Sequence, residues 1–258
     1  MSLKSYLFIK SGLSDADYRF EKIIKLSFDI QRLFDTNGER RSFLKKIRGF
    51  THVNYQRLKV LWDLANEYAK NKKPGAFVEA GVWRGGCAGI LSHISKKYGY
   101  KNRLFFFDSF EGLPQPSSKD GKNAEIFADK NNKGVLRSIK KLIAEDIYIK
   151  SLLFDILKID KSKVKIVKGW FQKTLPKYKK ITGPIGILRL DGDWYESTKV
   201  CLENLYDLVL PGGYIIIDDY YFWDGCKKAV DEFVKTNNLG VKILPQDTSG
   251  AYFIKPTV

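Results

Sequence analysis

The chain has little cysteine and no long apolar run. Its three cysteines, Cys87, Cys201 and Cys226, are far apart in the 258-residue sequence. They lack metal-site spacing, and their odd number argues against a disulfide framework. No apolar stretch approaches the roughly 20 residues that span a membrane. The first residues, MSLKSYLFIK, lack the apolar core and small-residue cleavage site of a secretory signal. We therefore expect a cytoplasmic protein without a membrane span.

Acidic residues are fewer than basic ones. The chain has 45 Lys and Arg against 29 Asp and Glu, a formal net charge of +16. Such an excess can attract nucleic acid, anionic membranes or anionic small substrates. The lysines are scattered in pairs, and no basic tail or basic helix stands out. We rank a solvated surface first, acidic substrates second and nucleic acid third, and expect no nucleic-acid partner. A basic nucleic-acid-binding protein, with strongly salt-dependent binding, is the alternative from another class.

The length and composition suit one α/β domain with appendages. Hydrophobic residues make up 44% of the chain and aromatic residues 14%, which is typical of globular proteins. In residues 1–50, apolar residues at helical spacing predict a helix from Asp15 to Phe34, so we treat 1–50 as an N-terminal helical extension. This extension could cover a substrate or form a dimer contact, which leaves a homo-oligomer open. Residues 51–258 form the main domain.

Two apolar strands run directly into acidic residues. The segment ILRLDGDWYEST (Ile187–Thr198) leads to Asp191 and Asp193, and GGYIIIDDYY (Gly212–Tyr221) leads to Asp218 and Asp219. A helical pattern separates them, so they form a βαβ unit that brings all four carboxylates to one sheet edge. A hard cation such as Mg²⁺ would offset their repulsion. The alternative is that some are helix N-caps. Asp193, in particular, could cap the helix that starts near Tyr195.

A glycine-bearing turn and a second acidic strand end precede this unit. In AFVEAGVWRGGCAGIL (Ala76–Leu91), Glu79 ends a strand and Gly81 lets the backbone approach a ligand. An acidic residue there suits an ammonium group better than a pyrophosphate. Asp108 ends the strand in RLFFFDSFEGLP (Arg103–Pro114), a position suited to the two hydroxyls of a ribose, although it could be an ordinary turn residue.

The remaining segments complete the predicted sheet. Residues 115–133 form a polar loop, of the length that usually indicates a lid or disorder, and residues 134–154 return to helical character. VKIVKGWFQKTLP (Val164–Pro176) predicts a strand and a turn, Gly169 to Phe171, whose aromatic rings could pack on an adenine or in the core. After a helix at residues 224–234, the segments 241–247 and 251–255 predict a hairpin, one strand of which inserts antiparallel.

Six motifs in order resemble the macrocin O-methyltransferase (TylF-like) family of S-adenosylmethionine-dependent enzymes. They are VEAGVWRGG (Val78–Gly86), DSFEGLP (Asp108–Pro114), KGWFQKTLP (Lys168–Pro176), LRLDGDWYEST (Leu188–Thr198), LPGGYIIIDDY (Leu210–Tyr220) and CKKAVDEF (Cys226–Phe233). The resemblance spans about residues 52–254. It implies a Rossmann-like class I methyltransferase fold: a seven-stranded, mostly parallel sheet with one antiparallel strand, helices on both faces, and a lid at 115–146.

The resemblance also implies an activity and its residues. We expect an S-adenosylmethionine- and Mg²⁺-dependent O-methyltransferase acting on a glycoside, sugar nucleotide or glycan precursor. A catechol-type or other small-molecule hydroxyl is the alternative acceptor. The implied general base is Asp193, and the implied metal ligands are Asp191, Asp218 and Asp219. The implied cofactor-binding residues are Glu79, Ala80, Gly81, Val82, Asp108, Ser109, Gly169, Trp170, Phe171 and Asp191. The chain departs from the family at two points. Ala80 replaces a more usual Thr or Cys. Several members have a histidine near the lid, whereas the segment 115–154 of this chain has none.

Overall fold

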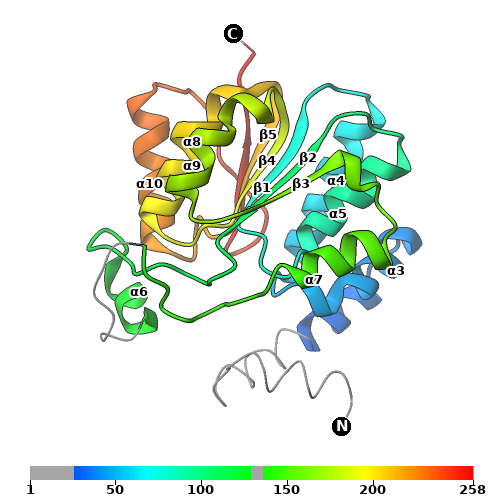
Figure 1. Cartoon of the computed structure of the whole chain (residues 1–258), viewed down its shortest axis with the longest axis horizontal. Helices are drawn as coiled ribbons and strands as arrows, with labels where there is room; N and C mark the ends of the chain where they lie inside the picture. Colours follow the sequence, from blue (N-terminus) through cyan, green and yellow to red (C-terminus); the bar gives the residue numbers. More distant parts are fainter. Residues whose placement is uncertain (1–25, 129–135, 258) are drawn as a thin grey trace.

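The computed structural model describes residues 26–128 and 136–257, and within these residues one seven-stranded sheet runs through the molecule (Figure 1). The strand order is β3-β2-β1-β4-β5-β7-β6. The strands are β1 (Ala76–Ala80), β2 (Leu104–Asp108), β3 (Val164–Lys168), β4 (Ile185–Leu190), β5 (Val209–Ile217), β6 (Leu244–Pro245) and β7 (Ala251–Ile254).

The direction of the strands confirms the predicted fold. β1 to β5 are parallel to one another, whereas β7 pairs antiparallel with both β5 and β6. The chain order reverses between β1 and β4, because β2 and β3 lie on one side of β1 and the later strands lie on the other. Ligands of open α/β sheets bind beyond the carboxyl ends of the strands at such a switch point.

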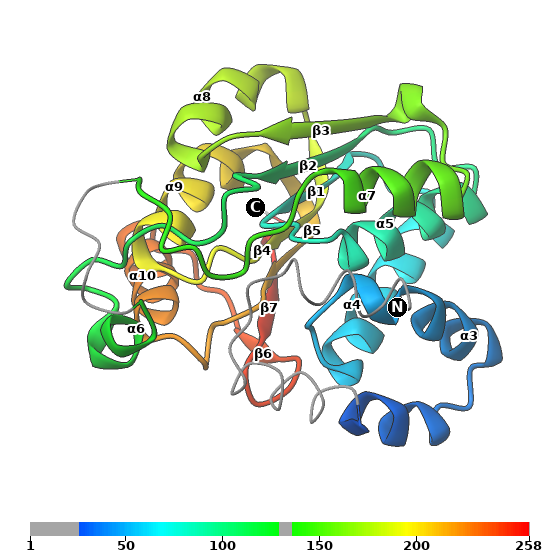
Figure 2. The same cartoon turned by 60° about the horizontal axis from the view of Figure 1, so that its bottom comes forward.

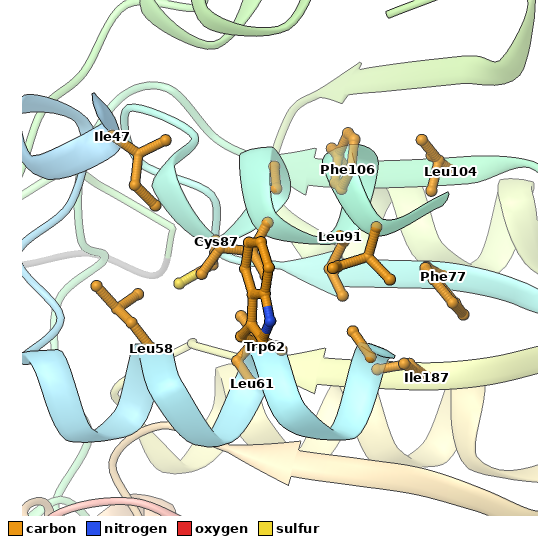
Figure 3. Packing of buried hydrophobic residues seen from close by; sticks show 14 of the residues in the cluster. Ile47, Leu58, Leu61, Trp62, Phe77, Cys87, Leu91, Leu104, Phe106 and Ile187 are labelled. Carbon is orange, nitrogen blue, oxygen red and sulfur yellow. The ribbon is translucent and has the colours of Figure 1, made fainter. Parts of the chain in front are cut away.

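Successive side chains of each buried strand point to opposite faces of the sheet, so the hydrophobic core is divided between the two faces. Ile187 packs on one face of β4 and Leu188 on the other. The first face is covered by α4 (Tyr55–Lys70) and α5 (Gly86–Lys97), on which α3 (Gly38–Ile47) packs, and the second by α8 (Phe171–Thr182), α9 (Tyr195–Leu205) and α10 (Asp224–Thr236). In Figure 3, the α4 side chains Leu58, Leu61 and Trp62 lie opposite Cys87 and Leu91 of α5. Helices thus cover both faces, as the alternating pattern requires.

Local sequence explains where the helices on the first face begin. The side chain of Asn37 accepts a hydrogen bond from the backbone N–H of Arg40 at the start of α3, and that of Asn54 accepts one from Arg57 at the start of α4. Such caps satisfy N–H groups that have no partner inside the helix. The second cap fixes the point at which Arg57 enters the carboxyl edge of the sheet.

The N-terminal extension is described only in part. Residues 26–33 are helical, in agreement with the second half of the predicted helix, while residues 15–25 of that prediction lie outside the described residues. Phe28 and the α3 residues Leu44 and Ile47 are buried in the same core cluster as α4 and α5. This part of the extension therefore packs on the main domain.

The predicted lid crosses the carboxyl edge of the sheet, which is brought forward in Figure 2. It contains α6 (Gly121–Ala128) and an isolated bridge between Pro114 and Ser138. The prediction of helical character for 134–154 was wrong over residues 136–146, which form no helix; α7 (Ile147–Lys150) starts later and continues as a π-helical turn (Ser151–Ile156). The backbone of residues 137–141 pairs instead with residues 113–115, as in the hydrogen bond from Ile139 N to Leu113 O at 2.9 Å.

In the part of the chain that the structure describes, no helix combines the length and the apolar character needed to cross a membrane.

Candidate active site

The carboxyl ends of the parallel strands meet at a cavity of about 720 Å³. Backbone pairing continues one residue past several strands, because Gly81 N donates to Phe107 O, Asp191 N to Ala80 O, and Asp218 N to Leu190 O, at 2.8–2.9 Å. The first loop residue after β1, β4 and β5 therefore has a fixed position. The charged side chains that line the cavity are Arg57, Glu79, Asp108, Arg189, Asp191, Asp193, Asp218 and Asp219.

A buried arginine lies under the acidic residues. Arg189 is 2% exposed and donates from Nη1 to Glu79 Oε1 at 2.7 Å and to Asp191 Oδ2 at 2.9 Å. Its Nη2 donates to Asp218 Oδ1. One cation thus links the ends of β1, β4 and β5. Buried carboxylates require such pairing, because an isolated charge in the interior is very costly.

Three of the four predicted carboxylates form a compact group. Ligand oxygens of Asp191, Asp193 and Asp219 all lie within 4.8 Å of one another. Burial, and then the charge of Asp218, raises the pKa of Asp191 to about 6. Burial, and then the charge of Asp191, raises the pKa of Asp193 to about 8, and burial with the charge of Asp193 raises the pKa of Asp219 well above its usual range. The shifts reflect charges that the protein itself leaves uncompensated.

Asp218 differs from the other three carboxylates. Besides Arg189, it accepts hydrogen bonds from Arg57 Nη1, one to its side chain and one of 3.0 Å to its backbone oxygen. Two arginines therefore occupy Asp218, a predicted metal ligand, while Asp193, the predicted base, belongs to the open carboxylate group. The sequence predicted that all four carboxylates lie at one edge of the sheet, and the structure agrees. The sequence could not predict which of these carboxylates bind the two arginines.

The loop after β4 holds Asp193 in an unusual backbone conformation. Asp193 adopts φ +56°, and the preceding Gly192 is closely packed, because a Cβ on it would lie 3.1 Å from Ser197 Cβ. The indole N–H of Trp223 donates to Asp193 Oδ1 at 3.1 Å. Asp193 does not cap α9; the backbone N–H of Tyr195 is bound by Asp120 of the lid, a buried residue that sequence reasoning missed.

The glycine turn after β1 crosses directly over the end of β4. Gly81 has φ +93°, and a Cβ on it would lie 1.7 Å from the backbone oxygen of Asp191, so no other residue fits there. Asp108 holds the same turn from the other side. Its Oδ2 accepts the N–H groups of Val82 at 2.7 Å and Trp83 at 2.8 Å. Burial raises the pKa of Asp108, and these N–H groups act in the opposite direction.

Glu79 lines the cavity and has one carboxylate oxygen without a hydrogen-bond partner. Its Oε1 binds Arg189, whereas Oε2 is buried without a hydrogen-bond partner. Burial raises the pKa of Glu79 to about 8, although the charge of Arg189 lowers it. An unsatisfied buried carboxylate oxygen is costly, so a donor such as an ammonium group fits this position.

The other predicted cofactor positions divide into two sets. Val82, Ser109, Trp170 and Phe171 line the cavity along with Glu79, Gly81, Asp108 and Asp191. Ala80 and Gly169 do not line it: Ala80 is fully buried in the core, and Gly169, at φ +136°, forms the bend before Trp170. Phe171 is the first residue of α8, so the last residue of the predicted turn, Gly169 to Phe171, already belongs to a helix.

Sequence reasoning missed one wall of the cavity. Residues 50–54, from the segment between α3 and α4, line it together with Arg57 from the first turn of α4, and the motifs leave all of them unassigned. His52 is among them, its ring 4.0 Å from that of Trp83 between centroids. A close approach to Gly86, where a Cβ would lie 2.5 Å from Thr51 Cβ, brings this segment to the site. His93 of α5 lies outside this wall and stacks on Phe43, with the ring centroids 4.2 Å apart.

The residues present fit the predicted ligands on two observations of this chain. The Asp191, Asp193 and Asp219 group offers only carboxylate oxygens, the donor set that Mg²⁺ prefers. The turn held by Gly81 and Asp108, next to the unpaired oxygen of Glu79, forms a cradle that a side chain at position 81 would fill.

Comparisons with known proteins show which proteins this chain is similar to. The family model described as Macrocin-O-methyltransferase (TylF) matches residues 20–255, and so begins upstream of the motifs. The demethyldecarbamoylnovobiocin O-methyltransferase of Streptomyces niveus is 33% identical over 209 residues, covering 79% of this chain and 74% of that protein. The 8-demethyl-8-(2,3-dimethoxy-alpha-L-rhamnosyl)-tetracenomycin-C 4'-O-methyltransferase of Streptomyces olivaceus is 33% identical over 205 residues, with 79% and 74% covered.

Solved structures show the same architecture. The structure of the O-methyltransferase NovP superimposes with a TM-score of 0.69 at 29% identity, covering 81% of this chain and 83% of that one. The calicheamicin methyltransferase CalS11 gives a TM-score of 0.57 at 16% identity, with 94% and 93% covered, which supports the fold alone. Both comparisons place the seven-stranded sheet in the class I methyltransferase fold.

Proposed function

Because the chain belongs to the macrocin-O-methyltransferase family, we propose that it transfers the methyl group of S-adenosylmethionine to a sugar hydroxyl of a small-molecule glycoside. The family membership confirms the predicted O-methyltransferase activity. The assignment of a sugar hydroxyl as the acceptor goes beyond family membership and is part of the proposal. It is supported by the Streptomyces olivaceus relative, whose name includes a rhamnosyl group.

The observation that carries the proposal is the group formed by Asp191, Asp193 and Asp219 at the cavity. Asp193 is the residue of this group that we assign to proton removal. Its Oδ1 is held by Trp223, so Oδ2 is left for the hydroxyl of the acceptor. A sugar hydroxyl is almost fully protonated at neutral pH, and general-base help of this kind contributes on the order of 10²–10⁴ in rate.

The other two carboxylates of the group, Asp191 and Asp219, would hold Mg²⁺. When bound, this cation supplies positive charge that favours loss of the hydroxyl proton. Arg189 and Arg57 keep Asp218 in place behind the group. Asp218 therefore contributes to the site by fixing the end of β5, and it joins the ligands only if Arg57 moves away.

The opposite half of the cavity would hold the methyl donor. The Asp108 carboxylate lines the cavity, with Oδ2 bound to two backbone N–H groups and Oδ1 to that of Phe110, and its remaining acceptor capacity would take a ribose hydroxyl, while Glu79 Oε2 would accept an ammonium group. Trp170 and Phe171 supply flat apolar surface. S-adenosylmethionine supplies a methyl group already activated by the sulfonium charge, so the protein mainly has to align oxygen, carbon and sulfur. The backbone contact between Gly81 and Asp191 keeps the donor half in register with the acidic group.

The test is methyl transfer by the full-length protein from isotope-labelled S-adenosylmethionine to four acceptor classes: neutral glycosides, sugar nucleotides, glycan precursors and catechols. We expect label on a sugar hydroxyl of glycosides, located by mass spectrometry, and loss of that label in Asp193→Asn. Ser118→Ala, on the exposed part of the lid, is the matched control. Transfer only to catechols, or full turnover by Asp193→Asn, would refute the proposal.

A further inference from the structure

Two buried tryptophans lie in contact beside the acidic group. Trp194 precedes α9 and Trp223 precedes α10, and they are 1% and 8% exposed. Their ring centroids are 4.9 Å apart with an interplanar angle of 64°. Both also lie near Phe127 of the lid helix α6, at 6.3 Å and 5.6 Å respectively. By packing alone the two residues are close to equivalent.

Their indole N–H groups have different acceptors. Trp223 Nε1 donates to Asp193 Oδ1 at 3.1 Å, and Trp194 Nε1 donates to the backbone oxygen of Pro114 at 2.8 Å. Pro114 pairs with Ser138 where residues 113–115 meet residues 137–141, a paired base of the predicted lid that we call the lid stem. One tryptophan is thus bonded to a side chain of the acidic group and the other to the lid.

The environment of Trp223 makes it a rigid donor. Its backbone N–H donates to the backbone oxygen of Asp219 at 3.1 Å, so Trp223 joins Asp193, after β4, to Asp219, after β5. Phe222 packs edge-on against its ring at 4.7 Å. Asp193 lies in a left-handed backbone conformation just past the strand, where its carboxylate could otherwise rotate. The directed bond to Oδ1 selects one orientation of the carboxylate and leaves Oδ2 for another partner.

Resting on the proposed function, we propose that Trp223 is a positioning residue for the Asp193 carboxylate, whereas Trp194 positions the lid. The two roles affect different kinetic parameters. Misplacing a proton acceptor by a fraction of an ångström lowers the rate of the chemical step. Releasing the lid stem weakens the enclosure of the acceptor and leaves the chemistry of a bound acceptor intact.

The test compares Trp223→Phe with Trp194→Phe, which make the same change in the same aromatic cluster. Trp223→Phe is expected to lower kcat roughly 10- to 100-fold with little change in acceptor KM. Trp194→Phe is expected to raise acceptor KM roughly 2- to 10-fold, the loss of one neutral hydrogen bond, with kcat nearly unchanged. Calorimetric affinities of Trp223→Phe for S-adenosylhomocysteine and for Mg²⁺ should match wild type, because the proposed cofactor and metal residues do not include Trp223.

A second variant keeps the test decisive if Trp223→Phe folds poorly. Benzothienylalanine at position 223 retains both rings and replaces the N–H with sulfur, and it should lower kcat as the phenylalanine variant does. Wild-type kcat in this variant would overturn the positioning role. So would an equal fall of kcat in both phenylalanine variants. Absence of methyl transfer by the wild type on every acceptor class would instead refute the proposed function and this proposal together.

Discussion

The buried Arg189 is the feature whose removal should be most damaging to the fold. It is 2% exposed and binds carboxylates of Glu79, Asp191 and Asp218. In Arg189→Met, Asp218 keeps Arg57, while the other two lose their cation. Removing one partner of a buried ion pair typically costs about 3–5 kcal/mol. At about 2–4 °C per kcal/mol for a chain of this size, we expect the melting temperature to fall by roughly 10 °C.

Calorimetric unfolding of the full chain measures this loss, with the exposed Arg41→Met as the control. If uncompensated charge is the cause, adding Glu79→Gln to Arg189→Met should restore about 1–2 kcal/mol, since the two changes are coupled. Mg²⁺ should also raise the melting temperature of Arg189→Met more than that of wild type. A loss below about 1 kcal/mol, or further destabilisation by Glu79→Gln, would refute the reasoning.

Three more outcomes are expected. Asp108→Asn should weaken S-adenosylhomocysteine binding roughly 10- to 100-fold in calorimetry, because a charged acceptor is lost, while the exposed Asp160→Asn should not; equal affinities would contradict this. EDTA should abolish turnover reversibly. Excess Mg²⁺ should partly rescue the turnover of Asp191→Asn but not that of Asp193→Asn; if both variants were rescued, both residues would be metal ligands. Burial alone would raise the pKa of Asp35, but hydrogen bonds from Arg40 and Tyr55 outweigh burial and hold this pKa well below its usual range. The stability it contributes is therefore complete above its unfolded pKa of about 3.9 and is lost as pH falls below that value, a slope that Asp35→Ala should lack in acid unfolding.

The sequence predicted the fold and the edge of the sheet because both depend on short-range patterns. Apolar runs of strand length ending in Glu79, Asp108, Asp191 and Asp218 indicate parallel strands, and parallel strands bring their carboxyl ends together. The hairpin that inserts β7 antiparallel follows from turn residues and alternation in the same way. Each of these predictions needs only neighbours along the chain and the rules of strand connection.

The partners inside the site could not be predicted because they come from distant segments. Arg189 was the one visible signal: a charged residue within a buried apolar strand must have buried partners. Asp120 reaches the start of α9 from the lid, and Arg57 reaches Asp218 from the segment before β1. No spacing rule relates these positions. The helical pattern after residue 134 misled for a related reason, since the backbone of 137–141 pairs with residues 113–115 at the base of the predicted lid.

Backbone pairing past the ends of β1, β4 and β5 has a consequence for motion at this edge. The amides of Gly81, Asp191 and Asp218 belong to the sheet ladder, although each residue lies in a loop. Their hydrogen exchange should require the same cooperative opening as the central strands, whereas amides two or three residues farther along exchange through local fluctuations. The boundary between slow and fast exchange therefore falls inside the site, with the amides of Asp191 and Asp218 on the slow side and that of Asp193 on the fast side.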